Sequence, residues 1–182
     1  MSLVRAYKVL VEGRSAFSGW RWPQPDGTQP GEWVRASAST PLGLCVNGVH
    51  ACTIEQLAQW LGQELWTIEL GGEILETEAA LVAERGRLLH RVRGWDEAAR
   101  KAFGADCAAR AAPRAAELRD GAALLAVVEQ LAGAGRAGEA GYWSAVIAGE
   151  RVAGRRSGPE YDAECERERA TQARWLASAL GL

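Results

Sequence analysis

Hydrophobic and polar positions alternate along much of the first half of the chain. Between residues 66 and 70, Trp66, Ile68 and Leu70 point to one side and the polar residues to the other, because side chains on a strand repeat every two residues. Similar stretches predict further strands at residues 3–12, 32–37, 42–52, 73–77 and 81–93. We interpret these as a mixed, mainly antiparallel sheet.

Residues 81–93 alternate most clearly in their second half. Leu88, His90 and Val92 share one side, which predicts that His90 lies in the core. Arginines occupy the other side, at Arg85, Arg87, Arg91 and Arg93.

We expect one helix to cover this sheet. Thr53 has the side chain of an N-cap, and Gln56 three residues later completes a capping box. Hydrophobic residues then recur on one face until Gly62, a residue typical of a helix end.

The second half of the chain has a helical composition. Residues 97–182 contain 25 alanines and residues 1–96 contain nine, and alanine has the highest helix propensity. Asp96 can cap a helix that runs to about residue 112, and Pro113 is suited to begin the next segment. The apolar stretch 122–131 predicts the buried central helix.

Glycines and a proline divide the remainder. Four glycines in residues 133–141 indicate a flexible connection, residues 142–152 resume a helical pattern, and Pro159 begins a last helix that Gly181 ends. The fold class predicted is therefore α+β, with a β-rich domain at residues 1–94 and a helical bundle at residues 95–182.

Composition excludes some classes of protein. The 182 residues are 48% hydrophobic and 24% charged with a formal net charge of −2, which argues against disorder and against a global field that attracts nucleic acid. Residues 1–5 lack a secretion signal and no apolar run is long enough to span a membrane. We expect a cytoplasmic protein whose four cysteines are reduced.

One cluster holds candidate chemistry. Cys45, His50 and Cys52 lie within eight residues and could supply three ligands to a structural zinc ion, with Cys107 or Cys165 as a fourth. Alternatively, Cys52 before the predicted helix is a nucleophile with His50 as its base. In a third interpretation His50 bonds a backbone carbonyl and the cysteines fill core space.

Tryptophans and arginines suggest binding. Trp20, Trp22 and Trp33 could form an exposed aromatic platform, or they could cover a thin core. Arg87 and Arg91 could bind an anion, or they could pair with glutamates on neighbouring strands.

Several short segments follow one another in a recognisable order. They are Tyr7-Lys8-Val9, Cys45-x-x-Gly48-Val49-His50-Ala51, a short helix, Ile68-Glu69-Leu70-x-Gly72-Glu73-Ile74 and an arginine-rich strand. Over about residues 6–93 this order resembles an uncharacterised family of bacterial and phage proteins. The resemblance implies no particular activity.

A second set of residues resembles an enzyme family. Arg5 or Arg14, the segment 37–40 (Ser-Ala-Ser-Thr) and the segment 76–78 (Glu-Thr-Glu) occur in the order found in ADP-ribosyltransferases of the arginine-serine-glutamate type. The resemblance implies NAD-dependent transfer. It assigns the main catalytic role to Glu78 and supporting roles to Glu76, Ser37 and Arg5.

No complete catalytic or cofactor-binding set is present in the sequence. Our leading prediction is a non-enzymatic binding or protein-interaction module without a cofactor, whose partner is another protein or a small anionic ligand. The ADP-ribosyltransferase-like enzyme using NAD and the zinc-stabilised structural protein are the alternatives. Neither a membrane nor nucleic acid is expected as a partner, and the oligomeric state is left open.

Overall fold

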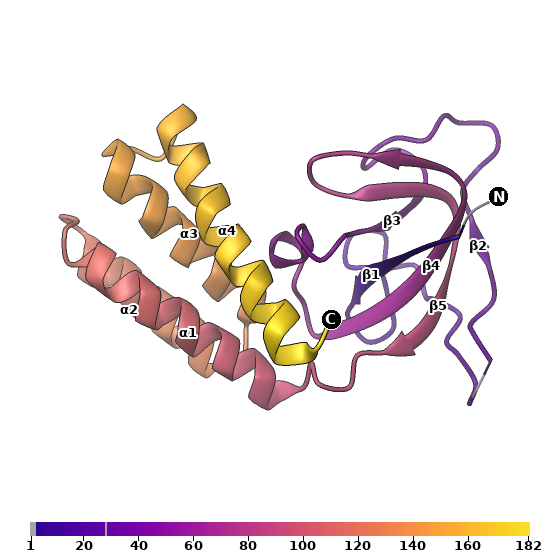
Figure 1. Cartoon of the computed structure of the whole chain (residues 1–182), viewed down its shortest axis with the longest axis horizontal. Coiled ribbons are helices and arrows are strands. Elements are labelled where there is room, and N and C mark those ends of the chain that lie inside the picture. The colour runs from indigo at the N-terminus through magenta and orange to yellow at the C-terminus, as the bar shows by residue number, and fades with distance from the viewer. Residues whose placement is uncertain (1–2, 28) are drawn as a thin grey trace. The chain divides into compact units, whose positions relative to one another are not determined.

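The computed structural model describes residues 3–27 and 29–182, and its fold class is the predicted α+β (Figure 1). Contacts divide the chain into two compact units, Met1–Arg93 and Gly94–Leu182. An antiparallel sheet forms the first unit and four helices form the second. None of the helices among the described residues is long and apolar enough to cross a membrane.

The sheet of the first unit contains five strands. They are β1 (Val4–Leu10), β2 (Val34–Arg35), β3 (Val49–Ala51), β4 (Glu64–Glu76) and β5 (Leu81–Arg91). Strand β4 lies between β1 and β5, and β5 also pairs with β2 and β3. Every pairing between these strands is antiparallel.

The sheet closes on itself beside Cys52. Tyr7 in β1 and Cys52, directly after β3, exchange two backbone hydrogen bonds of 2.9 Å each. Strands β1, β4, β5 and β3 therefore form a ring around the core (Figure 1).

The inner side of this ring is packed with apolar side chains. Its buried residues are Ala6, Leu10, Trp22, Val49, Ala51, Trp66, Ile68, Leu70, Leu81, Ala83 and Leu88. A register shift between Thr67 and Ile68 leaves His90 exposed. The prediction of a core His90 is therefore wrong, because a bulge reverses the alternation that strict period-two counting assumes.

The predicted covering helix at residues 53–62 is reduced to one 3₁₀ turn, η1 (Leu57–Gln59). Gln56 Oε1 accepts from the Thr53 N–H at 3.0 Å, so half of the expected capping box exists. Gln56 Nε2 donates to the carbonyl of Thr77 at 2.8 Å, and Trp60 Nε1 donates to that of Ala79 at 2.6 Å. These bonds to the β4–β5 turn hold the segment in place without a longer helix.

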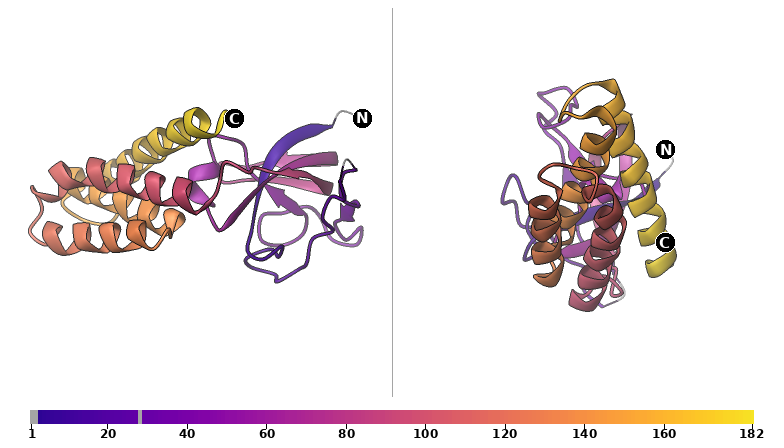
Figure 2. Two further views of the ribbon diagram at one scale, coloured as in Figure 1. Left: turned by 90° about the horizontal axis from the view of Figure 1, so that it is seen from below. Right: turned by 90° about the vertical axis from the view of Figure 1, so that its left-hand side faces the viewer.

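The second unit contains α1 (Glu97–Ala115), α2 (Gly121–Gly133), α3 (Ala137–Ala153) and α4 (Pro159–Leu180) (Figure 2). Asp96 caps α1 as predicted, because its carboxylate accepts from the Ala99 N–H at 2.8 Å. Pro159 begins α4, and Gly181 ends it with a φ of 64°.

Three expectations about these helices are wrong. Pro113 lies inside α1 near its end, where it removes one hydrogen bond without stopping the helix. The glycine-rich stretch 133–141 is mostly helical, because α3 begins at Ala137. The central helix is α3 and not α2, because small buried residues such as Gly141 and Gly149 let α4 side chains approach it closely.

Candidate functional site

The strand register gathers charged residues on the outer face of the sheet. Arg5 in β1 is opposite Glu69 in β4, and Glu69 is opposite Arg87 in β5. In the next row Gly71 of β4 is opposite Arg85, which is opposite Arg35 of β2. The neighbouring residues Ile68, Leu70 and Gly86 are buried on the inner side. We call Arg5, Trp33, Arg35, Glu69, Arg85 and Arg87 the basic face.

Backbone bonds hold Trp33 against this face. The Gly31 N–H donates to the carbonyl of Leu88 at 2.9 Å, and the Ala36 N–H donates to that of Glu84 at 2.7 Å. These bonds fix the segment around β2 along β5. The guanidinium carbons of Arg85 and Arg87 lie 4.7 Å and 4.6 Å from the centroid of a Trp33 ring.

The two stacked arginines differ in their partners. Arg87 donates through Nε and Nη2 to Glu69 Oε2 at 2.9 Å and 2.6 Å. Arg85 has a buried Nε without a hydrogen-bond partner and pairs with no carboxylate of the described residues. Arg91, predicted to bind with Arg87, lies exposed opposite Trp66 and outside the basic face.

The three predicted tryptophans do not form one platform. Trp22 belongs to the core, and its Nε1 donates to Ser15 Oγ at 2.8 Å. Trp20 is 59% exposed on a separate loop. Of the three, only Trp33 lies on the basic face. Trp22 therefore takes the predicted role in the core, and Trp20 is an exposed aromatic residue away from the basic face.

His50 holds the loop of the Cys-His cluster together. Its Nε2 accepts from the Cys45 N–H at 3.0 Å, so Nδ1 carries the proton and donates to the carbonyl of Gly48, also at 3.0 Å. Burial and the nearby Lys8 ammonium lower the pKa of His50, which favours this neutral form. The interpretation of His50 as a residue bonded to a backbone carbonyl therefore matches the geometry, but its second part is wrong for Cys45, which is exposed and fills no core space.

The cysteine environments do not favour catalysis. Cys52 is buried, its Sγ lies 3.5 Å from the carbonyl oxygen of Tyr7, and burial raises its pKa to about 12. No α-helix of the described residues starts at Cys52 to stabilise a thiolate, so the geometry gives the nucleophile hypothesis no support. Cys107 and Cys165 lie in the other unit. The described residues contain no group of three His, Cys, Asp or Glu side chains that could hold a metal ion.

The residues implied by the ADP-ribosyltransferase resemblance lie on separate parts of the sheet. Arg5 is opposite Glu69, and Glu69 lies seven positions before Glu76 along β4. Glu76 ends β4, and Glu78 lies exposed in the turn that follows. Ser37 is exposed beyond β2 and shares a hydrogen bond with Ser39. The NAD-dependent enzyme therefore gains no support from this geometry.

Lys8 is an unusual residue that the sequence pattern did not single out. It lies on β1 between the inward residues Ala6 and Leu10. Its Nζ donates to the carbonyl of His50 at 2.7 Å and lies 5.0 Å from the centroid of a Trp22 ring. Burial lowers its pKa to about 8. The alternation of β1 could have revealed it, because Lys8 has the parity of the core positions.

We expect Lys8 to make stability depend on pH. Between about pH 8 and 10.5 the unfolded chain keeps the lysine proton and the folded chain does not, so the free energy of unfolding rises with pH. Across this window the free energy of unfolding of the wild type should rise by about 2 kcal/mol more than that of Lys8→Met. Urea unfolding of both proteins at several pH values measures the difference. The exposed Lys101→Met is the control, and a flat difference for Lys8→Met contradicts the prediction.

The second unit contains a buried polar network. Glu168 on α4 is 2% exposed and accepts hydrogen bonds from Arg110 and Arg114 of α1, Ser144 of α3 and Gln172 of its own helix. Burial raises the pKa of Glu168, but the bonds from Arg114 and Arg110 outweigh it and leave the pKa lowered. Asp106 also pairs with Arg110, so two carboxylates balance the two arginines within the network, which favours a structural role.

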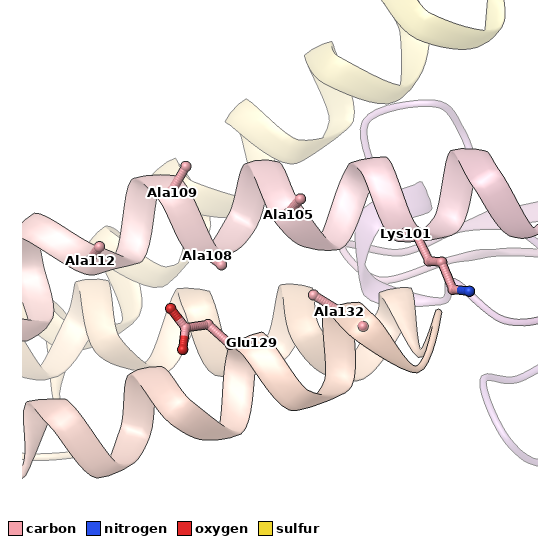
Figure 3. A pocket seen from close by; sticks show the side chains of 8 residues that line it. Lys101, Ala105, Ala108, Ala109, Ala112, Glu129 and Ala132 are labelled. Atoms are coloured by element: carbon pink, nitrogen blue, oxygen red, sulfur yellow. The ribbon is translucent and has the colours of Figure 1, made fainter.

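A groove of about 500 Å³ lies between α1 and α2, and Figure 3 shows the side chains that line it. Small side chains line most of it, with Lys101 near one end and the Glu129 carboxylate facing α1. The lining residues are Lys101, Ala105, Ala108, Ala109, Ala112, Glu129, Ala132 and Gly133. Lys101 is already paired with Glu97, so the groove offers little specific chemistry.

Comparison of the chain with protein-family models, curated proteins and solved structures finds no match. The functional argument therefore depends on the geometry of the two units, in which the basic face has the clearest binding chemistry.

Proposed function

We propose that this protein is a non-enzymatic interaction module that binds an acidic protein segment on its basic face. The proposal needs no cofactor. A cytoplasmic location remains a prediction of the sequence.

The proposal depends chiefly on the uneven pairing of arginines on this face. Of the five charged side chains, four are basic, although the whole chain has a net charge of −2. Glu69 is bonded to Arg87, and the described residues supply no carboxylate to Arg35 or Arg85. Arginine and tryptophan are also the residue types most enriched among those that dominate binding energy at interfaces.

Carboxylates fit this face better than a nucleic-acid backbone does. Glu69 already bonds an arginine stacked on Trp33, which is the contact that a partner's carboxylate can repeat. The net negative charge of the chain disfavours a long polyanion, whose affinity depends on neutralising many phosphates.

A labelled dodecapeptide of glutamates tests the proposal. We expect the wild type to bind it at low salt, with fluorescence anisotropy showing weaker binding as salt rises. The double variant Arg5→Gln/Arg35→Gln should bind about tenfold more weakly or worse, because the two lost charged contacts together contribute about 1.4 kcal/mol or more.

The matched control removes the same charge elsewhere. Arg91 and Arg119 are exposed and lie outside the basic face, so Arg91→Gln/Arg119→Gln should bind nearly as wild type does. Equal losses in the two double variants indicate a non-specific charge effect and contradict the proposal, as does a wild type that does not bind the peptide.

A further inference from the structure

We propose that Arg35 and Arg85 form a clamp for a single carboxylate of the acidic segment, with Trp33 as one wall of the site. This inference rests on the proposed function. It adds where on the basic face one carboxylate of the acidic segment binds.

Two arginines occupy directly opposite backbone positions on β2 and β5. Arg35 and Arg85 are register partners on the same side of the sheet, and like charges in that arrangement destabilise a strand pair. No salt bridge within the described residues relieves this repulsion. A bound carboxylate placed between the guanidiniums relieves it, so the empty clamp is selective for an anion.

The chain places no carboxylate at the neighbouring position in β4. Glu69 neutralises Arg87, but the residue in the equivalent position opposite Arg85 is Gly71, which has no side chain. The Arg85 side chain lies over this glycine beside Leu3, because a Cβ on Gly71 would be 3.0 Å from both Arg85 Nε and Leu3 Cδ2. Strand β4 therefore supplies no carboxylate to Arg85, and an acid that pairs with it would come from a partner.

Stacking prepares Arg85 for a planar ligand. Its guanidinium is held over the Trp33 ring at 4.7 Å, so part of its conformational freedom is already lost before binding. Nε is buried, which leaves the terminal nitrogens to donate to the carboxylate. Arginine donors match the geometry of a carboxylate better than lysine does.

Single and double variants test the clamp with the same glutamate dodecapeptide. We expect Arg85→Gln and Arg35→Gln each to weaken binding about tenfold. The double variant should be only slightly weaker than either single variant, because both side chains hold one group. Arg5→Gln, on the same face but outside the clamp, should weaken binding less than about threefold.

An NMR measurement at Arg85 tests the position of the clamp independently of the affinities. In NMR spectra of the wild type, the Arg85 Nε–Hε resonance should shift with bound peptide, while that of Arg151 in the helical unit should not. Additive losses for Arg35 and Arg85, or wild-type affinity in Arg85→Gln, overturn the clamp.

The outcomes separate the two proposals. Loss of binding in Arg5→Gln/Arg35→Gln together with intact binding in Arg85→Gln keeps the basic face and rejects the clamp. A wild type that does not bind the peptide rejects both. Tighter binding of a twelve-residue oligothymidylate than of the peptide rejects the carboxylate in favour of phosphate.

Discussion

Replacing Glu168 by alanine is expected to lower the free energy of unfolding of the helical unit by about 3 kcal/mol, because it leaves two arginines without their buried carboxylate. Arg110 Nε and Arg114 Nη1 donate to Glu168 at 3.0 Å and 2.5 Å. Both arginine side chains retain some exposure, at 21% and 26%, so water can partly replace the lost partner. For this reason we expect the lower end of the range for broken buried pairs.

Hydrogen–deuterium exchange of peptides from α1, α3 and α4 measures this loss in the helical unit, and peptides from β4 and β5 report on the other unit. Glu166→Ala is the matched control, because Glu166 is exposed on the same helix, and it should change stability by less than about 0.5 kcal/mol. Similar effects of the two variants contradict a buried network.

The same residue predicts sensitivity to acid. The folded-state pKa of Glu168 is lowered from 4.5, so the stability it contributes is present above that pH and is lost as the pH falls through the folded value. Glu168→Gln, which keeps the shape of the side chain, should make the helical unit less stable at neutral pH and flatten the loss in acid. An unchanged acid profile rejects this assignment.

Local signals predicted the helical unit well where one residue decides the outcome. The Asp96 cap, Pro159 at the start of α4 and Gly181 at its end act through backbone geometry within one turn. The wrong expectations concern features that depend on how several segments pack together. Pro113 does not end α1, and the small residues of α3, not the apolar ones of α2, occupy the centre.

The sheet was predictable as a set of strands but not in its details. Alternation correctly placed Arg85 and Arg87 on one side and Leu88 on the other. The bulge beside Thr67 is invisible to a period-two count, so His90 was placed in the core. Similarly, tertiary bonds of Gln56 and Trp60 determine residues 53–62 more than their helical pattern does.

The candidate site needed the register between strands. Arg87 and Trp33 were identified from the sequence as binding residues, but Arg35 and Arg85 gain their meaning from lying opposite each other. Among the described residues Arg85 pairs with no carboxylate, and its partner in β4 is Gly71. A single sequence does not contain that pairing, because one residue of slip exchanges the two faces of a strand.

Gly48→Ala is expected to destabilise the first unit by about 3 kcal/mol, through backbone strain and a steric clash together. Gly48 has a φ of 135°, which side chains rarely allow, and an added Cβ would lie 2.2 Å from Val82 Cγ1. Val82 is fully buried and is opposite His50 in the β3–β5 register, so it has little room to move. The Gly48 carbonyl also accepts the His50 bond that holds this loop.

Two further variants separate the strain from the clash. Gly19 has a φ of 66° with nothing within 4 Å of an added Cβ, so Gly19→Ala should cost only about 1 kcal/mol of strain. Adding Val82→Ala to Gly48→Ala removes the clashing methyl group, so the double variant should be less destabilised than the sum of the single variants. Hydrogen–deuterium exchange of β5 peptides measures each effect. Equal losses for Gly48→Ala and Gly19→Ala would show that Val82 yields, and that the ring of strands beside His50 is less tightly packed than its burial indicates.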